Sequence, residues 1–458
     1  MAFNEFFCRS GGSNLNAGSR DGSTTEPGTS PDYEYASGNY VHGTGVFTVA
    51  SGDPSSDGVQ VGDYASIYAD GSTETDFVAR VTAVSSTTIT VDTATKYHGN
   101  NPTGGTANRT LRIGGAWAGP SGSVAFPMSS GWLRYQFTDG SGNKPRLNIK
   151  NDVAPADLAV TLYVSRDTRC EGYETTAGDL GTKPVFIWTG AVNGVTVDFS
   201  AHLTNMHVKS TNVGSYIGVR PPSLFGMRVR DVIAEGWQSR GFDLNVNGFR
   251  FGLTRCVAIN CGTGFYCNVV GQNPITCSMA IDCTTGFRGN HVAHCVATGC
   301  TTGFGKLSNT GELAISCDAY DCTTGFDMGA AEYLLCNAVS CTTGFAISPN
   351  YPYWLTGCGV GGGAYANGTD YEVAYAELIS SLVEYETHPW VDPGNNDFRL
   401  DATKLLSDGV TSVLNQGYSA VGSEYNGNVG APSIGALPVA GAAGGGLMRI
   451  GMNGGFGA

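Results

Sequence analysis

The sequence CVAINCGTGF occupies residues 256–265, and the chain repeats it in related form as SMAIDCTTGF (278–287), CVATGCTTGF (295–304), CDAYDCTTGF (317–326) and CNAVSCTTGF (336–345). The closing phenylalanines are 22, 17, 22 and 19 residues apart. A period near twenty, without helical spacing inside the unit, is typical of a solenoid of short strands. The repeated Cys-Thr-Thr-Gly is β-branched and punctuated by glycine, which disfavours helical repeats.

One coil of such a chain cannot bury its own apolar face, so the coils are expected to stack strand on strand as a parallel β-helix in an all-β fold. Within a unit, the apolar positions alternate with the period of a strand. We therefore predict that the repeated cysteines and phenylalanines form the interior. These residues are Cys256, Cys261, Cys283, Cys295, Cys300, Cys317, Cys322, Cys336, Cys341, Phe265, Phe287, Phe304, Phe326 and Phe345.

The chain has 14 cysteines, and 12 of them lie from Cys256 to Cys358. They fit a disulfide framework, a metal site or a ladder of buried thiols. A zinc site needs close cysteine pairs that converge on one point, whereas these cysteines recur coil by coil. A disulfide between coils would need a particular side-chain geometry at a strand spacing of about 4.8 Å. We favour the thiol ladder and expect no metal and no cofactor; Cys8 and Cys170 receive no role.

The totals exclude several classes of partner. The net charge is −14 over 458 residues, which argues against nucleic-acid binding. We find no apolar run of about 18 residues, so no membrane insertion is expected. The first residues, MAFNEFFCRSGGSN, lack the basic start and apolar core of a secretion signal. A virion location, reached by assembly in the host cytoplasm and release by lysis, is the expectation; the alternative is an extracellular or cell-surface location.

Changes in composition and in the pattern of apolar residues divide the chain into four parts. Residues 1–110 contain alternating stretches such as DFVARVTAVSSTTITVD and predict a small β-domain for attachment or capping. The β-helix is expected over 111–365, with its cysteine-rich coils at 256–345. A capping region follows over 366–440, in which residues 369–388 show helical spacing and a capping box. The glycine-rich tail, 441–458, is expected to order against a neighbouring subunit.

Several stretches outside the repeats resemble a known superfamily. They are LRIGGAWAGP (111–120), PRLNIKND (145–152), CEGYETTAGDLGTKP (170–184), HPWVDPGNNDFRLDATKLLSDG (388–409) and APSIGALP (431–438). They are similar to parts of the right-handed parallel β-helix proteins of the pectate-lyase-like superfamily, and residues 1–110 resemble those of phage and environmental β-helix proteins. The resemblance implies a right-handed coil. The superfamily includes lyases, hydrolases, adhesins and phage tailspikes, and its tailspikes imply a trimer by analogy.

Enzymes of this superfamily place carboxylates on the outer face of adjacent coils. The position before the second cysteine of each repeat makes Asp282 and Asp321 the candidate catalytic acids. They are two coils apart, about 10 Å, which is marginal for a catalytic pair, and solvated turn carboxylates are the favoured interpretation. Tyr351, Tyr353 and Trp354 form an aromatic loop for glycan stacking or, alternatively, for packing on the next coil. Arginines near the start of the coils fit an acidic sugar or, in the favoured interpretation, a solvated face with salt bridges.

These observations predict a non-enzymatic structural or attachment protein of a virus particle, of the phage tailspike, fibre or decoration type, with a β-helix surface available for glycan binding. The alternatives are a bacterial extracellular adhesin or matrix protein, and a polysaccharide lyase or glycoside hydrolase acting on the β-helix face. The expected partners are further copies of the chain, other virion proteins and host-surface glycans.

Overall fold

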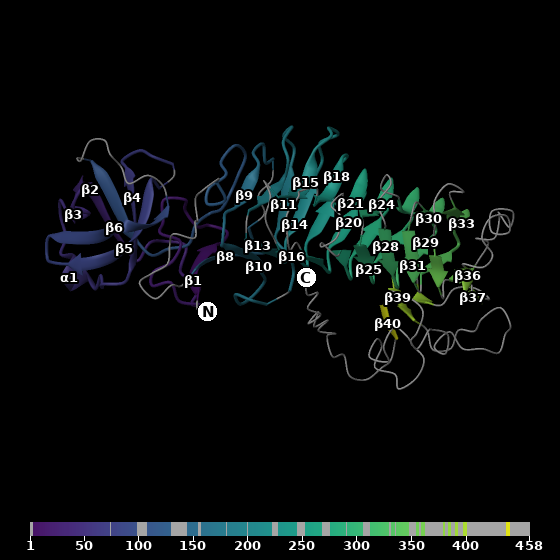
Figure 1. Ribbon diagram of the computed structural model, residues 1–458. Helices are drawn as coiled ribbons and strands as arrows, with labels where there is room; N and C mark the ends of the chain where they lie inside the picture. Colours follow the sequence, from purple (N-terminus) through teal and green to yellow (C-terminus); the bar gives the residue numbers. More distant parts are fainter. Residues whose placement is uncertain are drawn as a thin grey trace, which may run out of the picture.

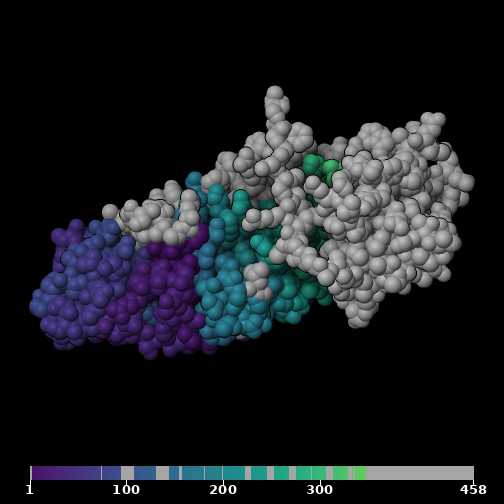
Figure 2. Space-filling view, turned by 90° about the horizontal axis from the view of Figure 1, so that it is seen from below, coloured from purple at the N-terminus to yellow at the C-terminus, as the bar shows by residue number. Residues whose placement is uncertain are grey.

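The computed structural model shows a nearly all-β protein with a small barrel at one end of a long parallel β-solenoid (Figure 1). The structure describes residues 3–73, 75–98, 108–129, 144–153, 157–179, 181–198, 200–221, 228–244, 252–267, 275–289, 291–305, 312–328, 331–334 and 336–347, together with short strands from residue 354 onward. Seen from below, the first residues of the chain, in purple, lie between the blue barrel and the teal coils (Figure 2).

The amino-terminal barrel is closed, with its strands in the order β2-β3-β6-β5-β4-β7. Their bounds are β2 Tyr33–Val41, β3 Val46–Thr48, β4 Tyr64–Ala69, β5 Phe77–Val84, β6 Thr88–His98 and β7 Arg109–Ile113. Phe47, Ile67 and Phe77 are among the residues that fill its interior. Strands β5 and β6 pair in antiparallel orientation as a hairpin. The short helix α1 (Pro54–Asp57) begins at Asp53, whose carboxylate accepts a hydrogen bond from the backbone N–H of Ser56.

The first strand of the chain belongs to the solenoid and not to the barrel. Strand β1 (Phe3–Cys8) pairs in parallel with β8 (Lys144–Lys150), from Phe3 opposite Lys144 to Cys8 opposite Ile149. The barrel is therefore inserted between the first two strands of one sheet. The sequence predicts one amino-terminal domain over residues 1–110 and does not reveal this pairing, because β1 carries no repeat signal of its own.

Three parallel sheets form the solenoid. The first contains β1, β8, β10 Arg169–Tyr173, β13 His202–Thr204, β16 Arg228–Arg230, β19 Gly252–Thr254, β22 Ile275–Thr276, β25 His291–Ala293, β28 Glu312–Ile315, β31 Ala331–Leu334, β34 Trp354–Thr356 and β36 Ile379–Ser380. The second contains β11 Val185–Trp188, β14 His207–Ser210, β17 Ile233–Glu235, β20 Val257–Ile259, β23 Met279–Ile281, β26 Val296–Thr298, β29 Asp318–Tyr320, β32 Asn337–Val339, β35 Gly359–Gly361 and β37 Val383–Tyr385.

The third sheet contains β9 Leu162–Val164, β12 Val195–Val197, β15 Ile217–Arg220, β18 Arg240–Asp243, β21 Thr263–Cys267, β24 Thr285–Gly289, β27 Thr302–Phe304, β30 Thr324–Met328 and β33 Thr343–Ile347. From β10 to β33 the chain visits the three sheets in a fixed order, one strand in each per coil. This arrangement is the parallel β-helix that the repeats predict.

The repeat phenylalanines stack face to face inside the solenoid. Neighbouring rings in the stack have centroids 4.6–5.0 Å apart and planes within 10° of parallel. In order along the axis, the stack contains Phe242, Phe265, Phe287, Phe304, Phe326 and Phe345. Identical residues face one another because the parallel register pairs, for example, Phe304 with Phe326. The glycine before each phenylalanine lies against the backbone of the next coil; a Cβ on Gly303 would meet the Gly325 carbonyl oxygen at 2.6 Å. The Thr-Gly-Phe phrase therefore follows from the packing.

The corner between the second and third sheets needs one residue in the left-handed region of backbone space. The φ angles there are 52° for Asn260, 52° for Asp282, 63° for Gly299, 50° for Asp321 and 55° for Ser340. Glycine, asparagine and aspartate tolerate this region better than other residues. The corner between the first and second sheets also has a residue with positive φ in successive coils. The residues there include Asn205, Asp231, Arg255, Cys277, His294 and Ser316.

The predicted helix over 369–388 is wrong where the structure describes that stretch. Ile379–Ser380 and Val383–Tyr385 are strands that pair in parallel with β34 and β35. The ends of the first and second sheets offer unpaired backbone groups, and β-branched Ile379 and Val383 suit strands that complete them. The rest of 369–388 lies outside the described residues, as does the tail 441–458. Strands β38 (Trp390–Asp392), β39 (Asp397–Leu400) and β40 (Leu437–Val439) form a separate small sheet.

The phenylalanine stack leads to a test of stability. Phe326 is fully buried between Phe304 and Phe345. We expect Phe326→Ala to lower the free energy of unfolding by about 3–5 kcal/mol, the usual effect of emptying a packed aromatic site. Denaturant unfolding measures this, with Thr323→Ala at an exposed position of the same coil as the control. An unchanged midpoint for Phe326→Ala would contradict the stacked interior.

Candidate functional site

Asp282 and Asp321, the two candidate catalytic acids, lie at exposed corners of the coil. The Asp282 backbone N–H donates to the Thr298 carbonyl oxygen, and that of Asp321 donates to the Val339 carbonyl oxygen. The coil that carries Gly299 lies between them. The left-handed backbone of both residues accounts for aspartate at these positions without a chemical role.

The aromatic loop falls largely outside the described residues. Tyr351 and Tyr353 are not described, and Trp354 is described only as the first backbone position of β34, opposite Glu332. Glycan stacking on this loop stays a prediction.

The cysteines form two buried ladders, one behind each corner, as the sequence predicts. The inward corner positions of successive coils are Cys256, Ser278, Cys295, Cys317 and Cys336 in one ladder. The second ladder lies behind the other corner and contains Cys261, Cys283, Cys300, Cys322 and Cys341. Each of these thiols lies close to backbone carbonyl oxygens; the Cys261 Sγ is 3.3 Å from the Ile259 oxygen and 3.6 Å from the Ala234 oxygen.

The ladder thiols with a raised pKa are held in their protonated form; Cys283 differs, because the hydrogen bonds with the Cys261 and Cys300 thiols lower its pKa to about 4. Burial raises the pKa of Cys256 to about 12, and the neighbouring thiol of Cys300 raises the pKa of Cys322 to about 12. A thiol with so high a pKa is a poor nucleophile and a poor metal ligand. No disulfide is present among the described cysteines. The ladders therefore serve packing.

A row of basic side chains crosses the outer face of the first sheet at the barrel end of the solenoid. Arg146, Arg169, His202 and Arg228 occupy facing positions on the successive strands β8, β10, β13 and β16. Their side chains point outward because the neighbouring residues Leu147, Cys170, Leu203 and Val229 are buried in the core. We call these four residues the basic row.

Aromatic contacts and two carboxylates support the beginning of the basic row. The guanidinium groups of Arg146 and Arg169 lie 4.6 and 4.3 Å from the centre of the Phe3 ring. Arg146 is 3.4 Å from Glu5 and 3.8 Å from Glu171. The Glu5 carboxylate also accepts a hydrogen bond of 2.8 Å from the amide nitrogen of Asn148. Burial raises the pKa of Glu5.

The cations of the basic row act on one another. Burial lowers the pKa of His202 to about 4, and the positive charges of Arg169 and Arg228 act in the same direction. His202 is therefore neutral near pH 7. Burial and the charge of Arg146 also lower the pKa of Arg169. Such crowding of like charges is relieved by a bound anion.

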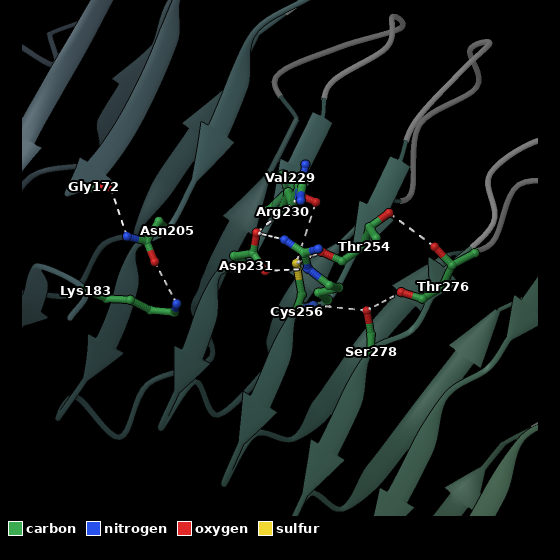
Figure 3. Close-up of polar contacts among 11 residues, drawn as sticks. Gly172, Lys183, Asn205, Val229, Arg230, Asp231, Thr254, Cys256, Thr276 and Ser278 are labelled. Atoms are coloured by element: carbon green, nitrogen blue, oxygen red, sulfur yellow. Dashed lines mark hydrogen bonds and ion pairs between the residues drawn. The ribbon is translucent and has the colours of Figure 1, made fainter. Parts of the chain in front are cut away.

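A polar cluster fills the corner next to the basic row (Figure 3). The Arg255 Nε donates to Asp231 at 2.7 Å, and its second nitrogen contacts the other oxygen of the same carboxylate. Arg230 lies 3.1 Å from Asp231. One coil earlier, the Lys183 Nζ donates to the Asn205 Oδ1 at 2.7 Å. Burial lowers the pKa of Lys183, whereas the Asp231 charge opposes this shift.

A third polar group lies on the second sheet, where Glu235 is held between His207 and Lys209. The Glu235 carboxylate is 2.8 Å from the His207 Nε2 and 2.7 Å from the Lys209 Nζ. Burial lowers the pKa of His207, although Glu235 opposes this. Burial acts to raise the pKa of Glu235, but the hydrogen bond from Lys209 leaves it below the usual value. This carboxylate is ionised and paired, which suits a fixed charge better than a proton donor.

The chemistry of the described polar groups suits anion binding. Among the described residues, no three His, Cys, Asp or Glu side chains converge in a way that would hold a metal ion. No helix in that part of the chain is long and apolar enough to span a membrane. Arginine, in contrast, binds carboxylate, sulfate and phosphate groups through paired N–H donors.

No family model, curated protein or solved structure matches this chain.

Sequence reasoning did not assemble the basic row. Arg146, Arg169 and His202 lie 23 and 33 residues apart, in segments that lack the Cys-Thr-Thr-Gly-Phe phrase. One signal was present: charged or polar residues alternate with apolar ones in RLN (146–148), RCE (169–171), HLT (202–204) and RVR (228–230). The prediction that arginines near the start of the coils form salt bridges is confirmed for two of them. Arg255 pairs with Asp231, and Arg240 lies 2.7 Å from Asp243.

The ladders predict how the cysteines react. Thiol titration of the unfolded, non-reduced protein is expected to find most of the 14 cysteines free. In the folded protein the same reagent should react slowly, because the described ladder thiols are buried. Five or more disulfides in the unfolded sample would contradict the ladder.

The corner geometry predicts opposite results for two substitutions of Asp282. Asp282→Gly should leave the free energy of unfolding nearly unchanged, because glycine adopts a φ of 52° without strain. Asp282→Val should lower it by about 1–2 kcal/mol, since a β-branched side chain is strained there. Thermal unfolding measures both, with Thr301→Val at a neighbouring exposed position as the control. Equal effects of glycine and valine would refute the backbone explanation.

Proposed function

We propose that the protein is a non-enzymatic structural and attachment protein of a virus particle. In this proposal the barrel end joins the particle, and the outer face of the coil meets the partner. The resemblance of the sequence to β-helix proteins that include phage tailspikes supports the class. The observation that carries the proposal is the way the barrel is built into the first coil.

The joint between barrel and coil is supported by strand pairing and by ionic contacts. Because β1 precedes the barrel and β8 follows it, the chain crosses the joint twice, and both crossings end in the same sheet. Glu26 bridges Arg9 at 3.0 Å and Lys150, on β8, at 2.9 Å. Phe6 stacks on Trp117 with ring centroids 5.4 Å apart. Such a joint transmits force from one end to the other, which suits an attachment protein.

The interior of the coil supports the same function. Stacked phenylalanines and thiols give each coil the same neighbours, so stability is mostly a sum of contacts between adjacent coils. A rod of this kind holds outward-facing side chains at fixed spacing along its length. A surface that binds a partner at several points benefits directly from that regularity.

The location of the protein tests this proposal. Particles purified by density gradient from a host culture that carries the gene should contain the full chain, and gold-labelled antibody against the coil should mark a surface projection. We also expect no new reducing ends or unsaturated products when the protein is incubated with anionic polysaccharides. Recovery only with bacterial cell envelopes would indicate an adhesin instead, and polysaccharide turnover would indicate an enzyme; either result would overturn the proposal.

A further inference from the structure

The outer face of the second sheet carries apolar side chains in the middle of the solenoid. The central residues of β17, β20 and β23 are Ala234, Ala258 and Ala280, which are fully buried in the interior cluster. The residues on either side of each alanine therefore point outward, because side chains alternate along a strand. All of these outward residues except Glu235 are apolar and half-buried, and we call the apolar ones the apolar strip. It consists of Ile233, Val257, Ile259, Met279 and Ile281.

The apolar strip is a property of this sheet and not of the whole coil. In the same coils, half-buried threonines occupy outward positions on both other sheets. They are Thr254 and Thr276 on the first sheet, and Thr263 and Thr285 on the third. Within the strip, the parallel register aligns the apolar side chains in two rows along the axis. A run of apolar side chains on one face, between polar faces, indicates a surface that another segment covers.

Charged residues border the apolar strip on the barrel side. There the Glu235 carboxylate is held by His207 at 2.8 Å and by Lys209 at 2.7 Å. Glu235 faces Ile259, so the polar border lies directly beside the first apolar side chains. An apolar centre with a polar margin is the usual composition of a binding interface.

The chain itself covers the continuation of the strip on the other side. Val296 follows Met279 in one row, and Val339 lies in the other row. Both point outward, because Ala297 and Ala338 beside them fill the interior. Val296 is nevertheless 1% exposed and Val339 0% exposed, and neither belongs to the interior cluster. A further layer of the chain therefore covers this face from β26 to β32, and the apolar strip is the part that stays half open.

The size of the apolar strip selects the kind of segment that fits it. Its three strands span only about 10 Å along the axis at the usual strand spacing. Two folded surfaces need about 800 Å² from each partner to form a stable interface, which is much more than five half-buried side chains offer. A short extended segment with apolar side chains on one face matches the strip better.

The glycine-rich tail contains such a segment. In LMRIGMN, residues 447–453, the apolar side chains of Met448, Ile450 and Met452 recur with the period of an extended strand. Residues 441–458 contain no acidic side chain and one basic one, Arg449. The net charge of −14 opposes contact between copies over most of the surface, so a contact between copies favours a segment without acidic groups.

We propose that residues 447–453 of one copy pack against the apolar strip of a second copy. Burial of the aliphatic and thioether side chains drives the contact, and flexible methionines on both sides adapt to one another. Each copy has both a tail and a strip, so two copies make the same contact twice. Two weak contacts in one pair act together and hold it more firmly than either alone. This inference goes beyond the proposed function and does not depend on it.

Self-association of the full-length protein tests the proposal. The wild-type protein should form a reversible oligomer in sedimentation equilibrium. Ile450→Asp in the tail and Ile259→Asp in the strip should each raise the dissociation constant about tenfold or more, because each puts a charge into an apolar contact. Ile259→Thr, which suits a strand, should have the same effect to a smaller extent. The matched controls are Asn453→Asp in the tail and Thr301→Asp at an exposed corner, and both should associate as the wild type does.

A mixture of the two aspartate variants separates contact between copies from contact within one chain. Ile450→Asp keeps an intact strip, and Ile259→Asp keeps an intact tail. Mixed in equal amounts, with a fluorescent label on one, they should form a mixed species that neither variant forms alone. Unfolding midpoints close to that of the wild type show that the variants are folded.

Four results would each overturn the proposal. They are a wild type that stays monomeric, an Ile450→Asp variant that associates as the wild type does, the absence of a mixed species, and losses of equal size in the control variants. The absence of a mixed species would mean that the strip binds the tail of its own chain or another protein. None of these measurements depends on where the protein is located, so their failure is distinct from a failure to find the protein on particles.

Discussion

The register between successive coils is the constraint on which the rest of the structure depends. Parallel pairing places each residue opposite its equivalent in the next coil, so one packing solution repeats along the axis. Phenylalanine stacks on phenylalanine, threonine faces threonine, and cysteine follows cysteine behind the corner. Where the repeat is imperfect, the shape of the interior is kept by other means. In the coil before Cys261, Trp237 occupies the position that a cysteine takes in the later coils, and its indole N–H donates a hydrogen bond to the Val208 carbonyl oxygen.

The corners explain why residues that suggest chemistry serve the backbone instead. Each corner requires a left-handed residue, and the chain places Asn260, Asp282, Gly299 and Asp321 at one of them. A Cβ on Gly299 would meet the Asp282 carboxylate oxygen at 2.2 Å, so these positions also interact along the axis. A carboxylate that recurs along a solenoid is thus weak support for catalysis unless its neighbours in the adjacent coils complete a site.

The same register organises charge on the outer surface. Arginines that are far apart in the chain become a single row, and burial together with the charges of Arg169 and Arg228 lowers the pKa of His202 between them. The adjoining corner cluster, in contrast, pairs Arg255 and Arg230 with Asp231. The overall acidity of the chain therefore coexists with a local basic surface, because Arg169 and Arg228, which form no ion pair within the described residues, lie at the barrel end of the solenoid.

The sequence alone determined the architecture wherever it repeats. Five copies of one phrase established the coil, the buried phenylalanines and the thiol ladders, since period and alternation report directly on parallel stacking. Only the tertiary structure decided those features that leave no local pattern in the sequence. The return of β1 to the sheet of β8 depends on pairing across more than 130 residues. The strands Ile379–Ser380 and Val383–Tyr385 formed where free sheet edges outweighed helical spacing. The basic row likewise exists only through register, because the coils that carry it have unequal lengths that hide the alignment of Arg146, Arg169 and Arg228.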